Sequence, residues 1–372
     1  MKLTSKDVAI LDFGSQKITV LVGCKDVNNT IIVKGHYEEP YDGFMDGEFL
    51  SPDMLQFSIK NAILGIQRAC NCKIMYLTVG VPTEFCYSTC QTVSQSFLKP
   101  KRITSEDIDN LFSSVSFDLP THTLVNKDAI YYVLGENNRV SSPIGQVDSK
   151  ISACLSYVLV ENSFLSTISK ALIKCDIVDF NFVSSAYAQG LYLFDDEERE
   201  KYALMVDCGY ITTTVALFRG RGVLNLSSFS LGGGNIIADL STCLKIPFDS
   251  AESLLRKVVL SIKPKENECY EIATSQGILP ISMGVANAIV ESRIEDIAKA
   301  IRQCFSTWKY QFPDFITIKL TGGGIAFLKG GKDVLARSLG RNVEIVKLAF
   351  GELSKYNHSS CMAVLNYALS NN

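Results

Sequence analysis

Two aspartates, Asp12 and Asp207, each stand where an apolar run of the chain meets a short turn that contains glycine. Each is followed by a glycine two positions later, a threonine seven positions later and a valine eight positions later. Carboxylates at the ends of two strands suit Mg²⁺, a hard cation that prefers oxygen ligands and keeps several of its waters. We therefore interpret Asp12 and Asp207 as candidate catalytic residues that bind Mg²⁺ through water.

The turns after both aspartates carry residue types that bind phosphate. Glycine lets backbone N–H groups approach phosphate oxygens, and hydroxyl and ammonium side chains add further donors. The candidate phosphate-binding residues are Gly14, Ser15 and Lys17 in the first turn and Gly209, Thr212 and Thr213 in the second. For either turn alone, a β-hairpin with a polar tip and no ligand is an open alternative.

Two glycine clusters follow in the second half of the chain. The first opens an expected helix, and the second comes directly after an expected strand. The candidate cofactor-binding residues here are Gly232, Gly233, Gly234, Gly322, Gly323 and Gly324. The alternative is that these glycines only form tight turns that need positive φ.

The elements that must position these residues occur twice. Residues 9–23 and 204–220 each consist of two apolar runs joined by a short turn, and an internal repeat of one supersecondary unit predicts two related domains. A chain of 372 residues is also longer than one hydrophobic core usually grows. In the first half the expected order is strand, strand, strand, helix, strand, which is an α/β unit.

The rest of the chain predicts further elements. Residues 84–162 indicate a small α+β segment, 177–194 a strand that enters a helix, and 195–201 a charged surface loop. Residues 283–308 carry apolar side chains at helical spacing and predict a long helix. The chain is expected to close with a last helix.

The composition excludes several classes of protein. With 47% hydrophobic and 20% charged residues and a net charge of -3, the chain has no footprint of a general nucleic-acid binder. Its 12 cysteines lack metal-ligand spacing, so we interpret them as reduced thiols. No signal peptide core and no run of about eighteen apolar residues occur, which predicts a cytoplasmic protein.

The motifs, taken in order, resemble the actin-like ATPase superfamily. "LDFGSQK" is similar to its first phosphate loop, "VDCGYITTT" to its second and "LTGGGIAFL" to its adenosine loop. The inserted segment, together with "SLGGGNIIADL", "DSAESLLRKV", "VESRIEDIAKAI" and "NHSSCMAVLNYAL", resembles the bacterial cell-division protein FtsA family. This resemblance covers residues 7–369.

The resemblance implies an α/β fold of the actin-like, ribonuclease-H-like kind, with two domains and a small α+β subdomain inserted in the first. The expected parts are domain I over 7–84 and 163–201, the inserted subdomain over 85–162, domain II over 202–349, and a C-terminal helix over 350–372 that returns to domain I. ATP or ADP with Mg²⁺ would bind between the domains. Glu252 would meet the ribose with Arg256 nearby, and Gly322, Gly323 and Gly324 would lie along the adenosine. A solvated helix face is the alternative for Glu252.

The resemblance also implies partners. Proteins of this family assemble into protofilaments and contact the tubulin-like FtsZ and other division proteins, so we expect self-association, FtsZ binding and a place at the division septum. A pilus-assembly or shape-determining actin homologue is the related alternative. A sugar-kinase-type phosphotransferase is the enzymatic alternative, but it needs a substrate-side carboxylate, for which the sequence offers no clear candidate.

Three departures from the family pattern modify these expectations. Val183 occupies the place where the superfamily usually offers a residue that positions the attacking water, so we expect weak or no ATP hydrolysis. Tyr210 and Ile211 replace small residues of the second phosphate loop. FtsA proteins continue into an amphipathic membrane helix, whereas this chain ends at Asn372 with no Lys or Arg after Lys355, so we expect no direct membrane anchor.

Overall fold

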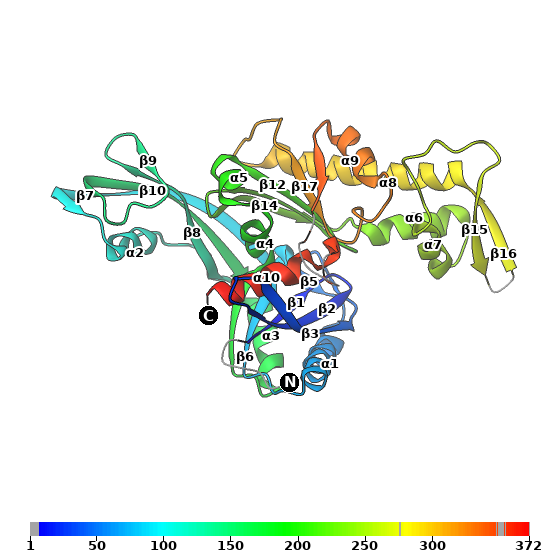
Figure 1. The fold of residues 1–372 in the computed structure, drawn as a ribbon, viewed down its shortest axis with the longest axis horizontal. Helices are drawn as coiled ribbons and strands as arrows, with labels where there is room; N and C mark the ends of the chain where they lie inside the picture. The colour runs from blue at the N-terminus through cyan, green and yellow to red at the C-terminus, as the bar shows by residue number, and fades with distance from the viewer. Residues whose placement is uncertain (1–6, 275–276, 347, 349–352, 354, 372) are drawn as a thin grey trace.

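The computed structural model describes residues 7–274, 277–346, 348, 353 and 355–371 (Figure 1). Two five-stranded sheets of the same plan form its centre. The first has the order β11 (Asp179–Ser184), β6 (Tyr76–Val81), β1 (Val8–Phe13), β2 (Lys17–Lys25), β3 (Ile31–Pro40). The second has the order β14 (Gly222–Phe229), β13 (Thr213–Arg219), β12 (Ala203–Cys208), β17 (Ile318–Thr321), β18 (Val343–Ile345).

In both sheets the first strand along the chain is central. It pairs antiparallel with the second strand, across a short turn, and parallel with the fourth. The repeat predicted from the two hairpins is therefore a repeat of whole-sheet topology.

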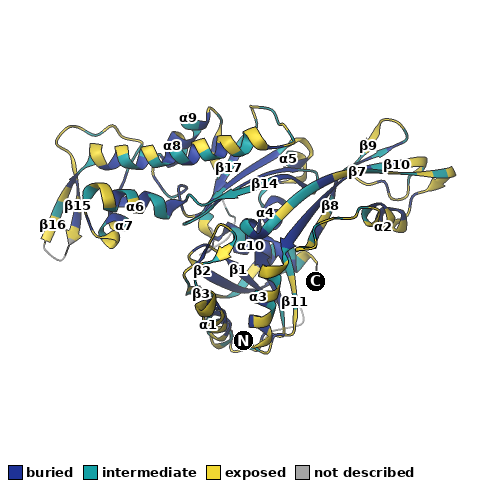
Figure 2. Cartoon of the chain, turned by 180° about the vertical axis from the view of Figure 1, so that it is seen from behind, coloured by how far each residue is buried: buried dark blue, intermediate teal, exposed yellow. Residues whose placement is uncertain are grey.

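Helices cover both faces of each sheet, so the central strands are buried on both sides (Figure 2). Two helices, α4 (Ser185–Leu193) and α10 (Ser359–Ser370), pack in one apolar core with residues from both sheets. The outer face of the first sheet packs against α1 (Pro52–Cys70) and α3 (Asn162–Ile173). The outer face of the second packs against α6 (Gly233–Leu244), α7 (Phe248–Leu255), α8 (Met283–Thr307) and α9 (Gly331–Leu339).

Strand alternation produces this division of the core. In β12, Leu204 and Val206 point to the outer helices, whereas Ala203 and Met205 point to α4 and α10. Side chains of successive strand residues point to opposite faces, so an unbroken apolar strand can serve two cores at once. The predicted long helix over 283–308 is confirmed as α8.

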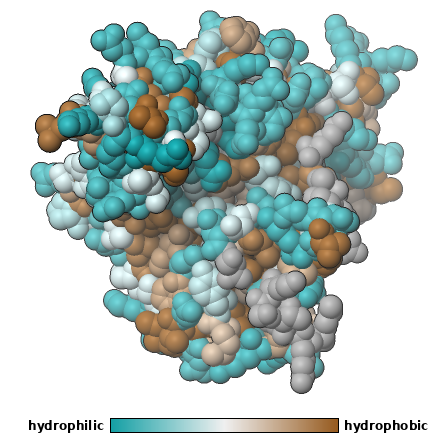
Figure 3. Space-filling model, turned by 60° about the vertical axis from the view of Figure 1, so that its left-hand side comes forward, coloured by the Kyte–Doolittle hydropathy of each residue, from teal (hydrophilic) through white to brown (hydrophobic). Residues whose placement is uncertain are grey.

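The segment of the chain between β6 and α3 forms a further sheet that projects from the body. Its order is β7 (Cys86–Arg102), β10 (Val147–Glu161), β8 (His122–Leu134), β9 (Asn138–Val140), all antiparallel, with α2 (Ser105–Ser113) beside it. Large apolar side chains are exposed on this part, among them Leu98, Ile144 and Val147. Figure 3, in which this end of the molecule comes forward, shows apolar patches separated by hydrophilic side chains.

The predicted domain limits stay a prediction, and the limit between 349 and 350 lies outside the described residues. The small elements are β4 (Phe44–Met45), β5 (Glu48–Phe49), β15 (Cys269–Thr274), β16 (Gly277–Ser282), α5 (Asp196–Lys201), η1 (Thr83–Phe85) and η2 (Tyr356–His358). Within the part of the chain that the structure describes, no helix has the length and hydropathy needed to cross a bilayer.

The prediction of a loop over 195–201 is wrong. The Asp195 side chain accepts from the N–H of Glu198 at 2.8 Å, and the Glu198 carboxylate accepts from the N–H of Asp195 at 2.9 Å. This reciprocal capping box satisfies N–H groups that otherwise lack partners at a helix start, so the acidic stretch begins α5. The loop was predicted from the high charge of this stretch, and the capping box was overlooked.

The packing of α4 on the second sheet gives a stability prediction. A methyl group at Gly190 would lie 2.3 Å from the Phe218 ring, and Phe218 is buried. We expect Gly190→Ala to lower the free energy of unfolding by about 1–3 kcal/mol, measured by urea denaturation, because an overfilled core must shift.

The matched control is Gly284→Ala in the first turn of α8, where the nearest heavy atom would be 3.9 Å away. This variant is expected to be neutral or slightly stabilising, since alanine favours helix over glycine. Equal destabilisation by the two substitutions would contradict the packing argument.

Candidate functional site

The two hairpin tips face one cavity of about 460 Å³ between the sheets. Residues of both hairpins line it, together with α4, α6, α7, the 322–327 segment and the start of α10. Its volume is within the range of ordinary small-molecule sites. Both Asp12 and Asp207 line it.

The two tips have the same geometry. Asp12 pairs with Thr19 and Asp207 with Thr214, so each aspartate has the same register in its hairpin. In the first turn the Gly14 N–H donates to the carbonyl of Lys17 at 3.0 Å, and in the second the Gly209 N–H donates to that of Thr212 at 2.8 Å. The sequence spacing thus reflects one turn geometry used twice.

One helix contacts both aspartates. The Ser185 hydroxyl donates to Asp12 Oδ1 at 2.9 Å, and the Gln189 amide Nε2 donates to Asp207 Oδ2 at 2.6 Å. Ser185 and Gln189 are four residues apart on α4 and therefore share one face of the helix. The sequence analysis missed both; their spacing on a predicted helix was the available signal.

A glycine beside each aspartate gives the carboxylate room. A Cβ at Gly80, on β6, would lie 2.4 Å from Asp12 Oδ1. A Cβ at Gly322, which has φ +86, would lie 2.4 Å from Asp207 Oδ1. Any side chain at these two positions would collide with the carboxylate of the neighbouring aspartate.

Burial dominates the electrostatics of the two aspartates. It raises the pKa of Asp207 to about 6, assisted by the nearby charge of Asp12 and opposed by the hydrogen bond from Gln189. Burial also raises the pKa of Asp12, opposed by the hydroxyls of Ser360 and Ser185. Among the described residues neither carboxylate has an ion-pair partner, so a divalent cation would relieve the cost of charging both.

A third carboxylate lines the same cavity. Glu84, in the short η1 turn after β6, has Oε1 buried without a hydrogen-bond partner among the described residues. Its Oε2 accepts from the Gly47 N–H at 3.5 Å. Burial raises the pKa of Glu84 to about 7. The sequence analysis found no such carboxylate, because a lone glutamate after a strand carries no pattern.

Comparisons with known proteins identify relatives of this chain. A sequence profile of the family described as Cell division protein FtsA matches residues 204–365. Cell division protein FtsA of Neisseria meningitidis serogroup B is 22% identical over 308 residues, which cover 80% of this chain and 73% of that protein. The chain is therefore a distant homologue of FtsA proteins over most of its length.

Solved structures give the fold. The PilM-PilN type IV pilus biogenesis complex is similar with a TM-score of 0.66 at 14% identity, covering 97% of this chain and 98% of that one. MreB 5 of Spiroplasma citri bound to AMPPNP has a TM-score of 0.57 at 11% identity, covering 100% and 98%. The MamK double helical filament has a TM-score of 0.54 at 13% identity, covering 97% and 98%. This is the actin-like ATPase fold, as predicted.

Most of the site residues predicted from the sequence line the cavity. These are Asp12, Gly14, Ser15, Lys17, Asp207, Gly209, Thr212, Gly233, Glu252, Arg256, Gly322 and Gly323. Four others, Thr213, Gly232, Gly234 and Gly324, are not among its lining residues. Thr213 is buried, and its hydroxyl donates to the carbonyl of Leu231 at 2.6 Å.

Three glycines outside the tips bind the second hairpin turn through their backbone. The N–H groups of Gly324, Gly233 and Gly234 donate to the carbonyls of residues 208, 209 and 210 at 2.7, 2.9 and 2.7 Å. These three N–H groups are already hydrogen-bonded within the protein. The alternative of a tight turn that needs positive φ fits Gly322, which has φ +86, but not these three glycines, which lack positive φ and instead allow close approach of the backbone.

The other side chains predicted to bind nucleotide already interact with groups of the protein. The Ser15 hydroxyl accepts from the Ile211 N–H at 3.0 Å, which leaves its own proton free to donate. The Lys17 ammonium forms an ion pair with Glu38 on β3. Glu252 and Arg256 form an ion pair with each other at 2.6 Å.

The predicted place of Val183 at the water-positioning site is wrong. Val183 is fully buried in the core between the sheets and does not line the cavity. It lies on β11, and the residues that reach the cavity from this stretch are Ser185, Ala186 and Gln189 on α4. The amide that the sequence did not predict is that of Gln189, on α4, six residues after Val183.

The raised pKa of Asp207 gives a prediction of stability against pH. A carboxyl with a folded pKa above its unfolded value stabilises the fold at low pH and loses this contribution as pH rises through about 6. Without magnesium, Asp207→Asn should therefore raise the free energy of unfolding at pH 7.5 by about 2 kcal/mol, and by less at pH 4.5. Urea denaturation at the two pH values measures this difference.

The control is Asp42→Asn, an exposed aspartate of a surface loop. It should change stability little, and equally at both pH values. If Asp207→Asn gave the same shift at pH 4.5 and 7.5, the ionisation of Asp207 would not be the cause.

Proposed function

We propose that this FtsA-family protein binds a magnesium–nucleotide complex in the cavity between its sheets and acts as an actin-like scaffold in bacterial cell division. The observation that carries the proposal is the pair of aspartates, Asp12 buried and Asp207 half-buried, at matched hairpin tips contacted by one helix. Structural neighbours support the choice of ligand, because MreB 5 of Spiroplasma citri was solved bound to AMPPNP.

The donor set of the cavity fits Mg²⁺. Two carboxylates with room beside them, at Gly80 and Gly322, supply the oxygen ligands and space for water that this ion requires. Asp12 and Asp207 would bind the ion, which when bound would neutralise phosphate charge. Ser15 and Thr212 offer hydroxyls to the phosphates.

The base and sugar would lie toward α6 and α7. Glu252 and Arg256 line that side of the cavity, and the ring of Tyr210 lies against the backbone of Gly234. An aromatic ring beside a charged pair suits a nucleoside, which presents a flat base and hydroxyl groups. Tyr210 is then a wall of the base pocket, although a smaller residue is usual there.

Partners are proposed from the family. An FtsA-family scaffold would self-associate into protofilaments and link FtsZ to other division proteins at the septum, with its conformation set by the bound nucleotide. MamK, which shares the fold, was solved as a double helical filament. A pilus-assembly role is the related alternative; recovery of FtsZ or of pilus components in a pull-down separates the two.

Nucleotide binding should depend on the first aspartate and on magnesium. Asp12→Asn keeps an acceptor for Ser185 but removes the charge, so we expect Mg-ATP to bind at least about tenfold more weakly. Calorimetric titration with Mg²⁺ and again with a chelator measures both dependences. Asp42→Asn is the control with the same chemical change on the surface. Equal affinity of wild type and Asp12→Asn would refute the proposed metal role.

We propose that ATP hydrolysis is slow, for a reason that does not involve Val183. Gln189 Nε2 already donates to Asp207 and, at 3.1 Å, to Ser359, so the N–H groups of this amide are not free to donate to a water. Glu84 Oε1 is the unpartnered acceptor, and burial raises the pKa of Glu84 to about 7. Glu84 also reopens the phosphotransferase alternative, since it could accept a proton from a substrate hydroxyl.

Glu84→Gln should lower residual phosphate release at least about tenfold and leave the affinity for Mg-ATP within about threefold, because a general base acts on the chemical step. Phosphate release is followed with and without candidate sugars. Turnover that requires a sugar would favour the phosphotransferase. Unchanged release in Glu84→Gln would exclude Glu84 as the base.

A further inference from the structure

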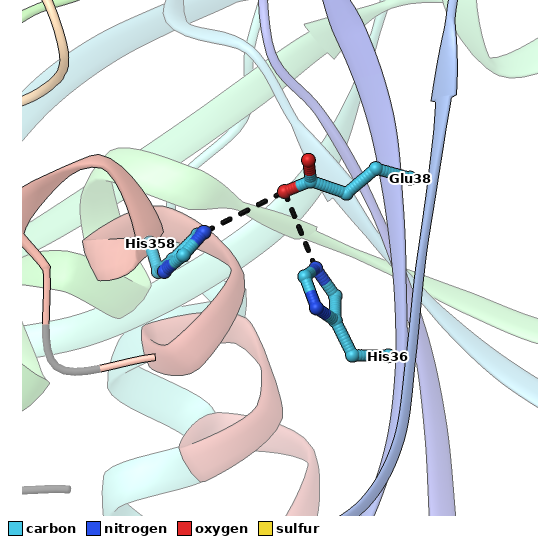
Figure 4. Close-up of side chains that lie close together, drawn as sticks. All are labelled: His36, Glu38 and His358. Carbon is cyan, nitrogen blue, oxygen red and sulfur yellow. Dashed lines mark hydrogen bonds and ion pairs between the residues drawn. The ribbon is translucent and has the colours of Figure 1, made fainter. Parts of the chain in front are cut away.

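A cluster of metal-ligating side chains lies beside the cavity, where β3 meets the segment before α10. His36 Nε2 is 3.2 Å and His358 Nε2 is 3.5 Å from the same oxygen of Glu38, Oε1. Figure 4 shows the two imidazoles converging on this carboxylate from different elements. The three ligand atoms lie within 4.8 Å of one another.

The fold explains how these residues meet. His36 and Glu38 alternate on β3 and therefore point to the same face of the strand. His358 ends the η2 turn that leads into α10, so it reaches this face from the far end of the sequence. Two of the chain's three histidines thus converge on one carboxylate.

We propose that His36, Glu38 and His358 form a binding site for a transition-metal dication of the Zn²⁺ type. A tetrahedral zinc ion with ligand bonds of about 2.0–2.1 Å places its ligand atoms about 3.3 Å apart. Two of the three spacings already have this value, at 3.2 and 3.5 Å. Two imidazoles and one carboxylate form a known zinc ligand set that leaves a position for water.

The environment of the His358 side chain suits a metal ligand. Its side chain is buried, and its Nδ1 has no hydrogen-bond partner among the described residues. Its Nε2 faces the Glu38 carboxylate, which can only accept, so a bound ion would displace the Nε2 proton while the unpartnered Nδ1 carries the other. His36 is exposed, which gives an ion a path to the site.

The cluster is connected to the cavity through Lys17. The Lys17 ammonium forms an ion pair with the same Glu38 Oε1 and also lines the cavity. A dication on Glu38 would repel this ammonium and free it for an anion in the cavity. This consequence rests on the proposed nucleotide function, whereas the metal site itself does not. Bound zinc would then strengthen nucleotide binding, and bound nucleotide would strengthen zinc binding by the same factor.

The test is titration of the full chain with Zn²⁺ against a competing chelator, with no nucleotide present. We expect His36→Ala to weaken binding at least tenfold, because one of three protein ligands is lost. His122→Ala is the matched control, since His122 is the remaining histidine and lies on the inserted sheet. Glu38→Gln is a second loss variant that keeps the size of the side chain.

Co²⁺ distinguishes this site from the free thiols of the chain. Four-coordinate Co²⁺ bound by imidazole and carboxylate gives visible bands without thiolate charge transfer, and these bands should be lost in His36→Ala and kept in His122→Ala. Thiolate bands, or equal zinc affinity of wild type and His36→Ala, would overturn the site. Failure of Mg-ATP to bind would leave this result unaffected, so the two proposals fail separately.

Discussion

The arrangement of the whole molecule follows from one unfavourable interaction, the approach of a buried and a half-buried carboxylate to a single cavity. Asp12 and Asp207 belong to different sheets, and burial raises the pKa of each. Such a pair persists only where the surrounding structure fixes it. Helix α4 does so through Ser185 and Gln189, and it is itself fixed because it packs against both sheets.

The sequence allowed the prediction of features that depend on local spacing. The hairpin register follows from the positions of an aspartate, a glycine and a threonine within eight residues, and α8 follows from an apolar stripe. Thr213 could have been excluded by the same reasoning. Strand side chains alternate, so Thr212 and Thr214 face the cavity while Thr213 faces the core.

Features that depend on contacts between distant segments could not be predicted. The spacing of Ser185 and Gln189 places them on one helix face, but only contacts with distant residues such as Asp207 show that this face belongs to the site. Glu84 is marked only by the cavity that it enters. Val183 was misplaced because an alignment of motifs gives the order of residues but not the face of the strand on which each lies. The His36, Glu38 and His358 cluster joins residues from the two ends of the chain.

Lys17 shows how such distant contacts can join two sites. A lysine carries a point charge on a flexible stem, so it can exchange one anionic partner for another with little strain. Here the partners are Glu38, in the imidazole cluster, and whatever anion enters the cavity. Because Glu38 Oε1 also faces two imidazoles, any change in their charge or ligation alters its attraction for Lys17. The electrostatic state of the cavity therefore depends on residues that do not line it.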